Sequence, residues 1–196
     1  MDKQKQKELR RAEILEAAKV VFSNTGYHKA DVNDIAKKAG IAKGTVYLYY
    51  PTKKALFLAV IELGLERLAV EIKNKLQDID DPLEKIKIAI KTYMLFFKNN
   101  QKFYRLLVHP DLELLDEIAG TFKDVKLAKL PQMTNIINKG IKQKVIRPID
   151  AESLSYMILG IVDFLLFQWL LNPEKESIEQ KVNQAYEVLF RGILNE

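Results

Sequence analysis

The sequence predicts an all-α fold, in which a small N-terminal head of three helices precedes a larger helical body. Apolar residues recur every three or four positions along most of the chain, which is the spacing of one buried helix face. No segment shows the apolar–polar alternation of a half-buried strand, and no internal repeat stands out. The charge also changes along the chain, from a basic N-terminal part to a balanced remainder. We therefore divide the chain into a head, residues 1–54, and a body, residues 55–196.

The composition favours a folded protein of a reducing compartment. Hydrophobic residues make up 48% of the 196 residues, so a core can form, and there is no cysteine for disulfide or thiolate chemistry. The N-terminal residues MDKQKQKELRR lack the apolar region of a secretory signal. The longest apolar run, Met157–Leu171, contains Asp163 and Gln168 and is shorter than the roughly 20 residues of a membrane span. We expect a cytoplasmic protein with no membrane partner.

Two short helices with a tight turn between them form the centre of the head. Asp31 can cap the first helix by accepting a backbone hydrogen bond, and Gly40 ends it because glycine adopts the left-handed conformation without a clash. The second helix runs from Lys43 to about Tyr50. Pro51 then stops it, since a residue before proline avoids the α region. Two helices joined by such a turn match the DNA-binding helix-turn-helix.

The second helix carries the predicted DNA contacts. Val46 and Tyr50 are four residues apart and can face the core. The remaining positions present donors and aromatic rings with no carboxylate, which suits a helix that enters the major groove. The outward residues are Lys43, Gly44, Thr45, Tyr47, Leu48 and Tyr49, and Lys53 and Lys54 follow as charges for the phosphate backbone. The alternative is a packed helical hairpin with solvated tyrosines, which three large aromatic residues on so short a helix disfavour.

The charge supports the same assignment. Residues 1–54 hold twelve Lys or Arg and six Asp or Glu, whereas the remaining residues hold nineteen and twenty. The positive excess therefore lies in the head, as expected for a surface that binds nucleic acid. Taken without the motif, a solvated lysine-rich surface would explain the charge equally well.

At these residues the chain resembles the TetR (tetracycline-repressor) family of bacterial transcription regulators. The matching pattern is DIAKKAGIAKGTVYLYYPTKKALF, preceded by AAKVVFSNTGY, and it covers about the first 60 residues. The resemblance implies an all-helical homodimer whose N-terminal domain binds operator DNA. It also implies a larger C-terminal domain that dimerises through its last two helices and usually binds a small-molecule inducer.

The resemblance also assigns DNA contacts by position. It places Thr45, Tyr47, Leu48, Tyr49 and Lys53 at contact positions, and Asn33 where some members read a base. Two features depart from the family pattern. Ala30–Asp31 stands where Thr–Thr is frequent, which puts an acid near the phosphates, and Ala42 replaces a capping serine.

The rest of the chain is predicted to form helices with clear boundaries. Asp80–Asp81–Pro82 and Asp150 mark helix starts, and Asn172–Pro173 is expected to cap a final helix. The helix over 151–171 is apolar almost all round, so we expect burial on several sides. The expected helices cover residues 8–24 (ended by Thr25–Gly26), 55–76, 82–98, 103–108, 112–119, 120–144 (with Pro131 starting or kinking its later part), 151–171 and the C-terminal stretch after residue 173.

The body offers two interpretations of its large apolar residues. An ordinary core explains most of them, but a pocket for a hydrophobic small molecule would be lined by the same types. Asp163 is informative because a carboxylate in an apolar helix needs a partner; it could orient a ligand or pair across a dimer. The candidate pocket residues are Tyr93, Phe96, Phe97, Tyr104, Phe122, Met133, Ile137, Met157, Asp163, Phe164 and Phe167.

Three functions remain to be compared. The leading hypothesis is a homodimeric repressor released from DNA by a hydrophobic inducer; repression rather than activation rests on the resemblance. GTVYLYY and GIVDF look like the subgroup that controls fatty-acid metabolism, which implies a long-chain acyl-CoA as inducer. The second hypothesis is an architectural DNA-binding protein without a ligand. Catalysis is disfavoured, because the chain has no paired carboxylates, Ser/His/Asp set or phosphate loop. We expect no cofactor and no metal, since His28 and His109 are isolated.

Overall fold

The computed structural model describes residues 3–108, 114–122 and 130–193, and these residues fold into ten α-helices. The all-α prediction is confirmed. The helices are α1 (Lys3–Lys29), α2 (Val32–Lys38), α3 (Lys43–Tyr49), α4 (Lys53–Leu76), α5 (Pro82–Asn99), α6 (Gln101–Val108), α7 (Leu115–Phe122), α8 (Leu130–Lys142), α9 (Ala151–Leu171) and α10 (Ile178–Ile193).

The chain forms two compact units. The first unit comprises Met1–Glu66 and Lys102–Asp124, and the second comprises Arg67–Gln101 and Val125–Glu196. The division therefore falls within α4 and not between residues 54 and 55, where the sequence analysis drew the boundary between head and body. The reason is that the first half of α4 contributes to the core of the first unit, through side chains such as Phe57 and Ile61.

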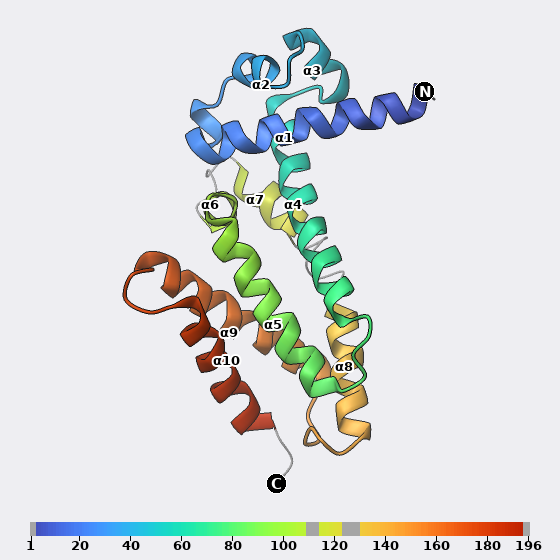
Figure 1. The fold of residues 1–196 in the computed structure, drawn as a ribbon, viewed down its shortest axis with the longest axis vertical. Coiled ribbons are helices and arrows are strands. Elements are labelled where there is room, and N and C mark those ends of the chain that lie inside the picture. The colour runs from blue at the N-terminus through green and yellow to red at the C-terminus, as the bar shows by residue number, and fades with distance from the viewer. Residues whose placement is uncertain (1–2, 109–113, 123–129, 194–196) are drawn as a thin grey trace. The chain divides into compact units, whose positions relative to one another are not determined.

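The core of the first unit lies under the helix-turn-helix. α2 packs against both α1 and α3. Figure 1 shows α2 and α3 on the same side of α1. Phe22 of α1 meets Phe57 of α4 edge to face, with ring centroids 5.0 Å apart. Buried apolar residues of the four helices close this core: Ile14, Leu15, Ala18, Phe22, Val32, Ile35, Ala36, Val46, Leu56, Phe57, Val60 and Ile61.

Helices α6 and α7 belong to the first unit as well. Lys102 Nζ donates to Asn24 Oδ1 at 2.6 Å, and Lys54 of α4 pairs with Glu117 of α7. The ring of Phe103 lies against Gly64, where a Cβ would stand only 2.2 Å from Phe103 Cζ. Glycine at position 64 therefore lets α6 approach α4 closely.

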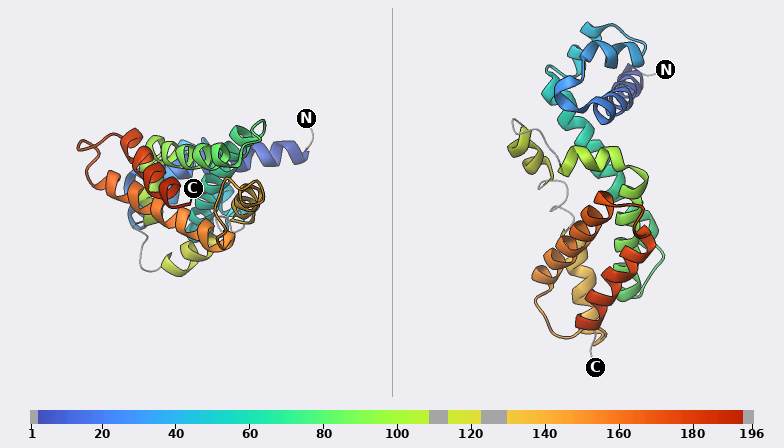
Figure 2. Two further views of the ribbon diagram at one scale, coloured as in Figure 1. Left: turned by 90° about the horizontal axis from the view of Figure 1, so that it is seen from below. Right: turned by 90° about the vertical axis from the view of Figure 1, so that its left-hand side faces the viewer.

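The second unit is a helical bundle. α5 packs against α8, α9 and α10, and α9 packs against α8 and α10 (Figures 1 and 2). Both predicted aspartate caps are present: Asp81 Oδ1 accepts from the Glu84 N–H at 2.8 Å, and Asp150 Oδ1 from the Ser153 N–H at 2.7 Å. The core is built from Ile86, Ile90, Met94, Phe97, Ile137, Leu154, Ile158, Val162, Leu166, Trp169, Val182, Ala185 and Leu189.

Several predicted boundaries need correction. α1 begins at Lys3 instead of Glu8, and it is interrupted at Gly26, whose φ of 76° is left-handed, before resuming to Lys29. The predicted helix over 112–119 begins in residues that lie outside the described ones, and α7 spans Leu115–Phe122, three residues beyond the predicted end. Residues 123–129 of the predicted helix over 120–144 lie outside the described residues, and α8 forms its later part.

The final helix begins later than predicted. Asn172–Pro173 does not cap it. Ser177 does, because its Oγ accepts from the Gln180 N–H at 3.2 Å while Gln180 Oε1 accepts from the Ser177 N–H at 2.7 Å. This reciprocal pair is a capping box, with glutamine three residues after the serine. The sequence contains that pattern, so it could have been found.

Helix α9 is less buried than its composition predicts. Tyr156, Met157, Phe164 and Leu171 are each about half exposed or more in the single chain. By length and composition alone α9 could also cross a membrane, although about a third of its most apolar 18-residue window is buried within the protein. The expectation of burial on several sides is therefore not met by one chain.

Candidate DNA-binding interface

Asp31 is the N-cap residue of α2. Its Oδ1 accepts from the backbone N–H of Asn33 at 2.7 Å, and its Oδ2 accepts from Asn33 Nδ2 at 3.3 Å. The backbone N–H of Asn33 is the main cause of the lowered pKa of Asp31, and Lys43 and Lys53 lower the pKa further. The acid that departs from the family pattern thus caps a helix. Asn33 would have to exchange its bond to Asp31 in order to read a base.

The turn between α2 and α3 has the geometry that glycine allows. Gly40 has a φ of +67°. Its N–H donates to the carbonyl of Lys37 at 3.1 Å, and the N–H of Ile41 donates to the carbonyl of Ala36 at 3.0 Å. These two bonds define a Schellman motif, which satisfies the last carbonyls of α2. The predicted glycine turn is confirmed, and it fixes the direction in which α3 leaves.

Helix α3 presents one face to the core and another to the outside. Val46 and Tyr50 are buried as predicted, with 1% and 4% exposure. Leu48 is 84% exposed and Tyr47 is 38% exposed. Outside the backbone of α3 itself, no atom of the described residues lies within 4 Å of the place where a Cβ of Gly44 would stand, so the described part of the fold does not require glycine there.

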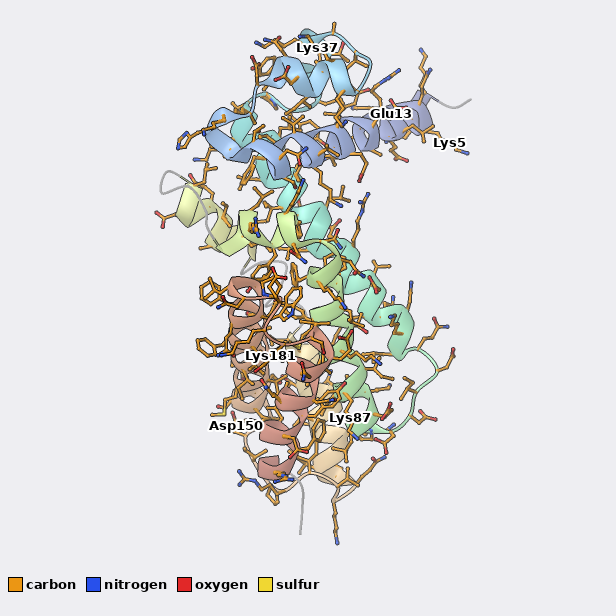
Figure 3. All side chains as sticks on the ribbon, turned by 60° about the vertical axis from the view of Figure 1, so that its left-hand side comes forward. Lys5, Glu13, Lys37, Lys87, Asp150 and Lys181 are labelled. Carbon is orange, nitrogen blue, oxygen red and sulfur yellow. The ribbon has the colours of Figure 1, made fainter. Side chains whose placement is uncertain are left out.

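The polar groups of this face are not used by the fold. Lys43, Tyr47 and Tyr49 make no side-chain hydrogen bond or ion pair with any residue that the structure describes. Lys5 on α1 and Lys37 on α2, labelled in Figure 3, are exposed on the same unit. A surface with free donors and positive charge can contact phosphates and base edges without first breaking internal bonds.

Arg11 anchors α3, a role that sequence reasoning missed. Its Nε donates to Tyr50 Oη at 3.0 Å, and its guanidinium carbon lies 5.6 Å from the centre of the Tyr50 ring. Burial raises the pKa of Tyr50, and the bond to Arg11 opposes that rise. The sequence analysis placed Arg11 only within the basic N-terminal part, because nothing local links residues 39 positions apart.

Lys53 has an internal role beside its predicted DNA contact. Its Nζ donates to the backbone carbonyl of His28 at 3.0 Å and lies 4.7 Å from the centre of the Tyr27 ring. Lys53 therefore connects the start of α4 to the end of α1. Thr52, which sequence reasoning did not single out, caps α4 by accepting from the Ala55 N–H at 3.0 Å.

Part of the predicted ligand cluster comes together in the second unit. The hydroxyl of Tyr93 on α5 donates to Asp163 on α9. The Tyr93 and Phe97 rings meet edge to face at 5.0 Å, and Phe96 and Phe97 at 5.3 Å. Asp163 thus has a partner within its own chain, so neither a ligand nor a second subunit is needed to account for it.

The other candidates are more scattered. Ile137 is fully buried and Met133 is half-buried, both on α8 of the same unit. Met157 and Phe164 are 57% and 66% exposed on α9, so they do not join an interior cluster. Phe167 is half-buried on α9. Tyr104 and Phe122 belong to the first unit, and the side chain of Phe122 lies outside the described residues.

Comparison with known proteins covers nearly the whole chain. Residues 14–60 match the family model described as "Bacterial regulatory proteins, tetR family", and residues 62–192 match the model "YsiA-like protein, C-terminal region". The fatty acid metabolism regulator protein of Bacillus subtilis is 26% identical over 195 residues, which cover 97% of this chain and 99% of that protein.

Solved structures share the fold. The fatty acid degradation regulator FadR from Bacillus halodurans superposes with a TM-score of 0.79 at 25% identity, over 92% of this chain and 94% of that one. FadR from Bacillus subtilis, solved in complex with stearoyl-CoA, has a TM-score of 0.80 at 24% identity, over 93% of this chain and 98% of that one.

Proposed function

The chain belongs to the TetR family of bacterial regulatory proteins, and from this premise we propose a homodimeric repressor that a long-chain fatty acyl ligand releases from its operator. Its helix-turn-helix makes it a DNA-binding transcription regulator. The observation that carries the proposal is the outward face of α3. Leu48 and Tyr47 are exposed there, and Lys43 and Tyr49 keep their polar groups free of bonds to other described residues.

The DNA contacts follow from that face. In a dimer, two copies of α3 would enter successive major grooves about 34 Å apart, so the operator would be a near-palindrome. Lys43 and the hydroxyls of Thr45, Tyr47 and Tyr49 would bind phosphates and fix the register. Gly44 would let the backbone approach the groove, because no Cβ stands in the way.

The second unit would supply dimerisation. Tyr156, Met157, Phe164 and Leu171 of α9, with Val188 of α10, are exposed apolar residues in the single chain. A two-fold axis would pair this surface with itself and remove it from water. The burial expected for α9 from its sequence would then be reached in the dimer.

The ligand site would lie in the second unit near Tyr93. Its aromatic neighbours Phe96 and Phe97 suit an acyl chain, and the Tyr93–Asp163 hydrogen bond supplies a polar pair. The relative named for fatty acid metabolism, 26% identical over 97% of this chain, and the FadR structure in complex with stearoyl-CoA support a fatty acyl-CoA over other hydrophobic molecules. The ligand would favour a conformation in which the dimer no longer fits its operator, which is a population shift.

Binding to DNA from upstream of the protein's own gene, compared with random DNA of equal length, tests the proposal. We expect Tyr47→Ala and Lys43→Ala to weaken binding to the upstream DNA, whereas Lys91→Ala, an exposed lysine of α5, should not. Stearoyl-CoA should release the bound DNA and coenzyme A alone should not. Wild-type affinity in both α3 variants would contradict the proposed interface.

An architectural DNA-binding protein is the alternative to a repressor. It would bind upstream and random DNA with a ratio near one and would not respond to stearoyl-CoA. We propose further that the protein acts in the cytoplasm without a membrane partner and catalyses no reaction, in keeping with the regulatory role of its relatives.

A further inference from the structure

Leu48 is the most exposed large apolar residue that the structure describes, at 84%. Its helix neighbours Val46 and Tyr50 are buried in the core. Removing apolar surface from water is favourable, and the core of the first unit does not use this side chain. Leu48 therefore keeps most of its apolar surface available to a molecule outside the chain.

Gly44 makes room beside Leu48. The two residues are four positions apart, so they lie on the same side of α3. A Cβ at position 44 would have no atom of another described segment within 4 Å, which leaves open space next to the leucine. A base edge can therefore come close to the backbone and reach the Leu48 side chain.

Apart from Lys43 and the hydroxyl groups, the remaining residues of α3 offer none of the usual base-reading groups. Lys43–Tyr49, KGTVYLY, contains no arginine for guanine, no asparagine or glutamine for adenine and no carboxylate for cytosine. Lysine can contact guanine, and the hydroxyls can contact several groups. The one apolar feature that a base presents in the major groove is the C5-methyl group of thymine. An exposed leucine on the recognition helix matches that feature and no polar one.

We propose that Leu48 is a specificity-determining residue that recognises the C5-methyl group of a thymine in each operator half-site. The inference rests on the proposed function, because it requires that α3 enters the major groove. It predicts that recognition at this position depends on a methyl group and not on a hydrogen bond. Uracil, which differs from thymine only by the methyl group, would then be a poor substitute.

The test begins with selection of duplexes from a random-sequence DNA library by the full-length wild-type protein. Each thymine of the enriched duplex is then replaced singly by deoxyuridine, and the dissociation constant is measured by fluorescence anisotropy. We expect one thymine in each half-site at which the replacement weakens wild-type binding about fourfold, since burial of a methyl group contributes about 0.8 kcal/mol. Replacement in both half-sites should weaken binding roughly fifteenfold.

The variant that decides the matter is Leu48→Ala. It should bind the thymine duplex more weakly than the wild type and should bind thymine and deoxyuridine duplexes equally well. Leu48→Met keeps the apolar volume and should retain most of the discrimination. Val70→Ala removes another exposed apolar side chain, on α4 of the second unit, and should leave both affinities unchanged. Unfolding midpoints of all variants exclude loss of structure.

The outcomes separate this inference from the proposed function. If the library yields no enriched sequence, the regulator itself is contradicted, and the inference fails with it. If a sequence is enriched but no thymine is sensitive to deoxyuridine, Leu48 does not read a methyl group. The same holds if Leu48→Ala keeps the full wild-type discrimination. In those last two cases the proposed function stands and this inference is overturned.

Discussion

Gly64→Ala tests the packing of α6 on α4. A Cβ at position 64 would stand 2.2 to 2.7 Å from three carbons of the Phe103 ring, and Phe103 is only 2% exposed, so the ring is enclosed by protein and must shift against its neighbours. Crowding of this kind costs about 1–3 kcal/mol. Replacement of a mid-helix glycine by alanine returns about 0.8–1.0 kcal/mol of helix propensity. We therefore expect a net loss of about 1 kcal/mol.

A double-mutant cycle of Gly64→Ala and Phe103→Ala isolates the contact between the two positions. Phe103→Ala alone should destabilise by about 3–5 kcal/mol, because a buried aromatic ring is removed. In that background Gly64→Ala should reverse sign and stabilise by up to about 1 kcal/mol, since the clash is gone and helix propensity remains. The coupling between the two positions should be about 1–3 kcal/mol.

Urea unfolding at a fixed protein concentration, followed by circular dichroism, measures these free energies. Gly44→Ala is the matched control, because a Cβ there meets no atom within 4 Å; it should not lower stability, although it should weaken DNA binding. Equal effects of Gly64→Ala in the two backgrounds, within about 0.5 kcal/mol, would refute the reasoning.

Three further predictions concern charged residues. Hydrogen bonds hold the pKa of Asp31 below its usual value. The stability that its carboxylate contributes is therefore present above pH about 4 and is lost as the pH falls through the lowered folded-state pKa. The free energy of unfolding, measured at a series of acid pH values, should fall less in Asp31→Asn than in the wild type. The buried Lys181 of α10, labelled in Figure 3, forms an ion pair with Glu176 at 2.6 Å and donates to Gln168 and Gln184. Lys181→Met leaves these acceptors without their donor, so it should destabilise by about 1–3 kcal/mol in urea titrations, more than Lys98→Met, which breaks the more exposed ion pair with Glu179. Lys43→Ala should reduce the slope of log affinity for the selected duplex against log salt concentration by about 1, and an unchanged slope would remove Lys43 from the phosphate contacts.

Local signals made the helix-turn-helix predictable. Asp31 and Gly40 act on backbone groups within five residues of themselves, so their roles follow from the sequence around them. The same is true of Asp150 at the start of α9. Ser177 also acts on a backbone group only three residues away. The start of α10 was misplaced because the serine–glutamine pattern was overlooked.

Long-range partners were not predictable from one sequence. Arg11 meets Tyr50, and Gly64 meets Phe103, across 39 residues each; many basic or aromatic residues could have taken those places. Asp163 was recognised as a residue in need of a partner, but not as the partner of Tyr93. Apolar composition also could not separate the buried from the exposed side of α9, because burial depends on which neighbours pack there.

The most direct test of the central claim is the dissociation constant of the wild-type protein for the enriched duplex and for a scrambled duplex of equal composition, at one moderate salt concentration. A sequence-specific regulator should bind the enriched duplex at least about a thousandfold more tightly, the lower end of the usual ratio. Equal affinity for the two duplexes would contradict operator recognition by α3 and favour an architectural protein.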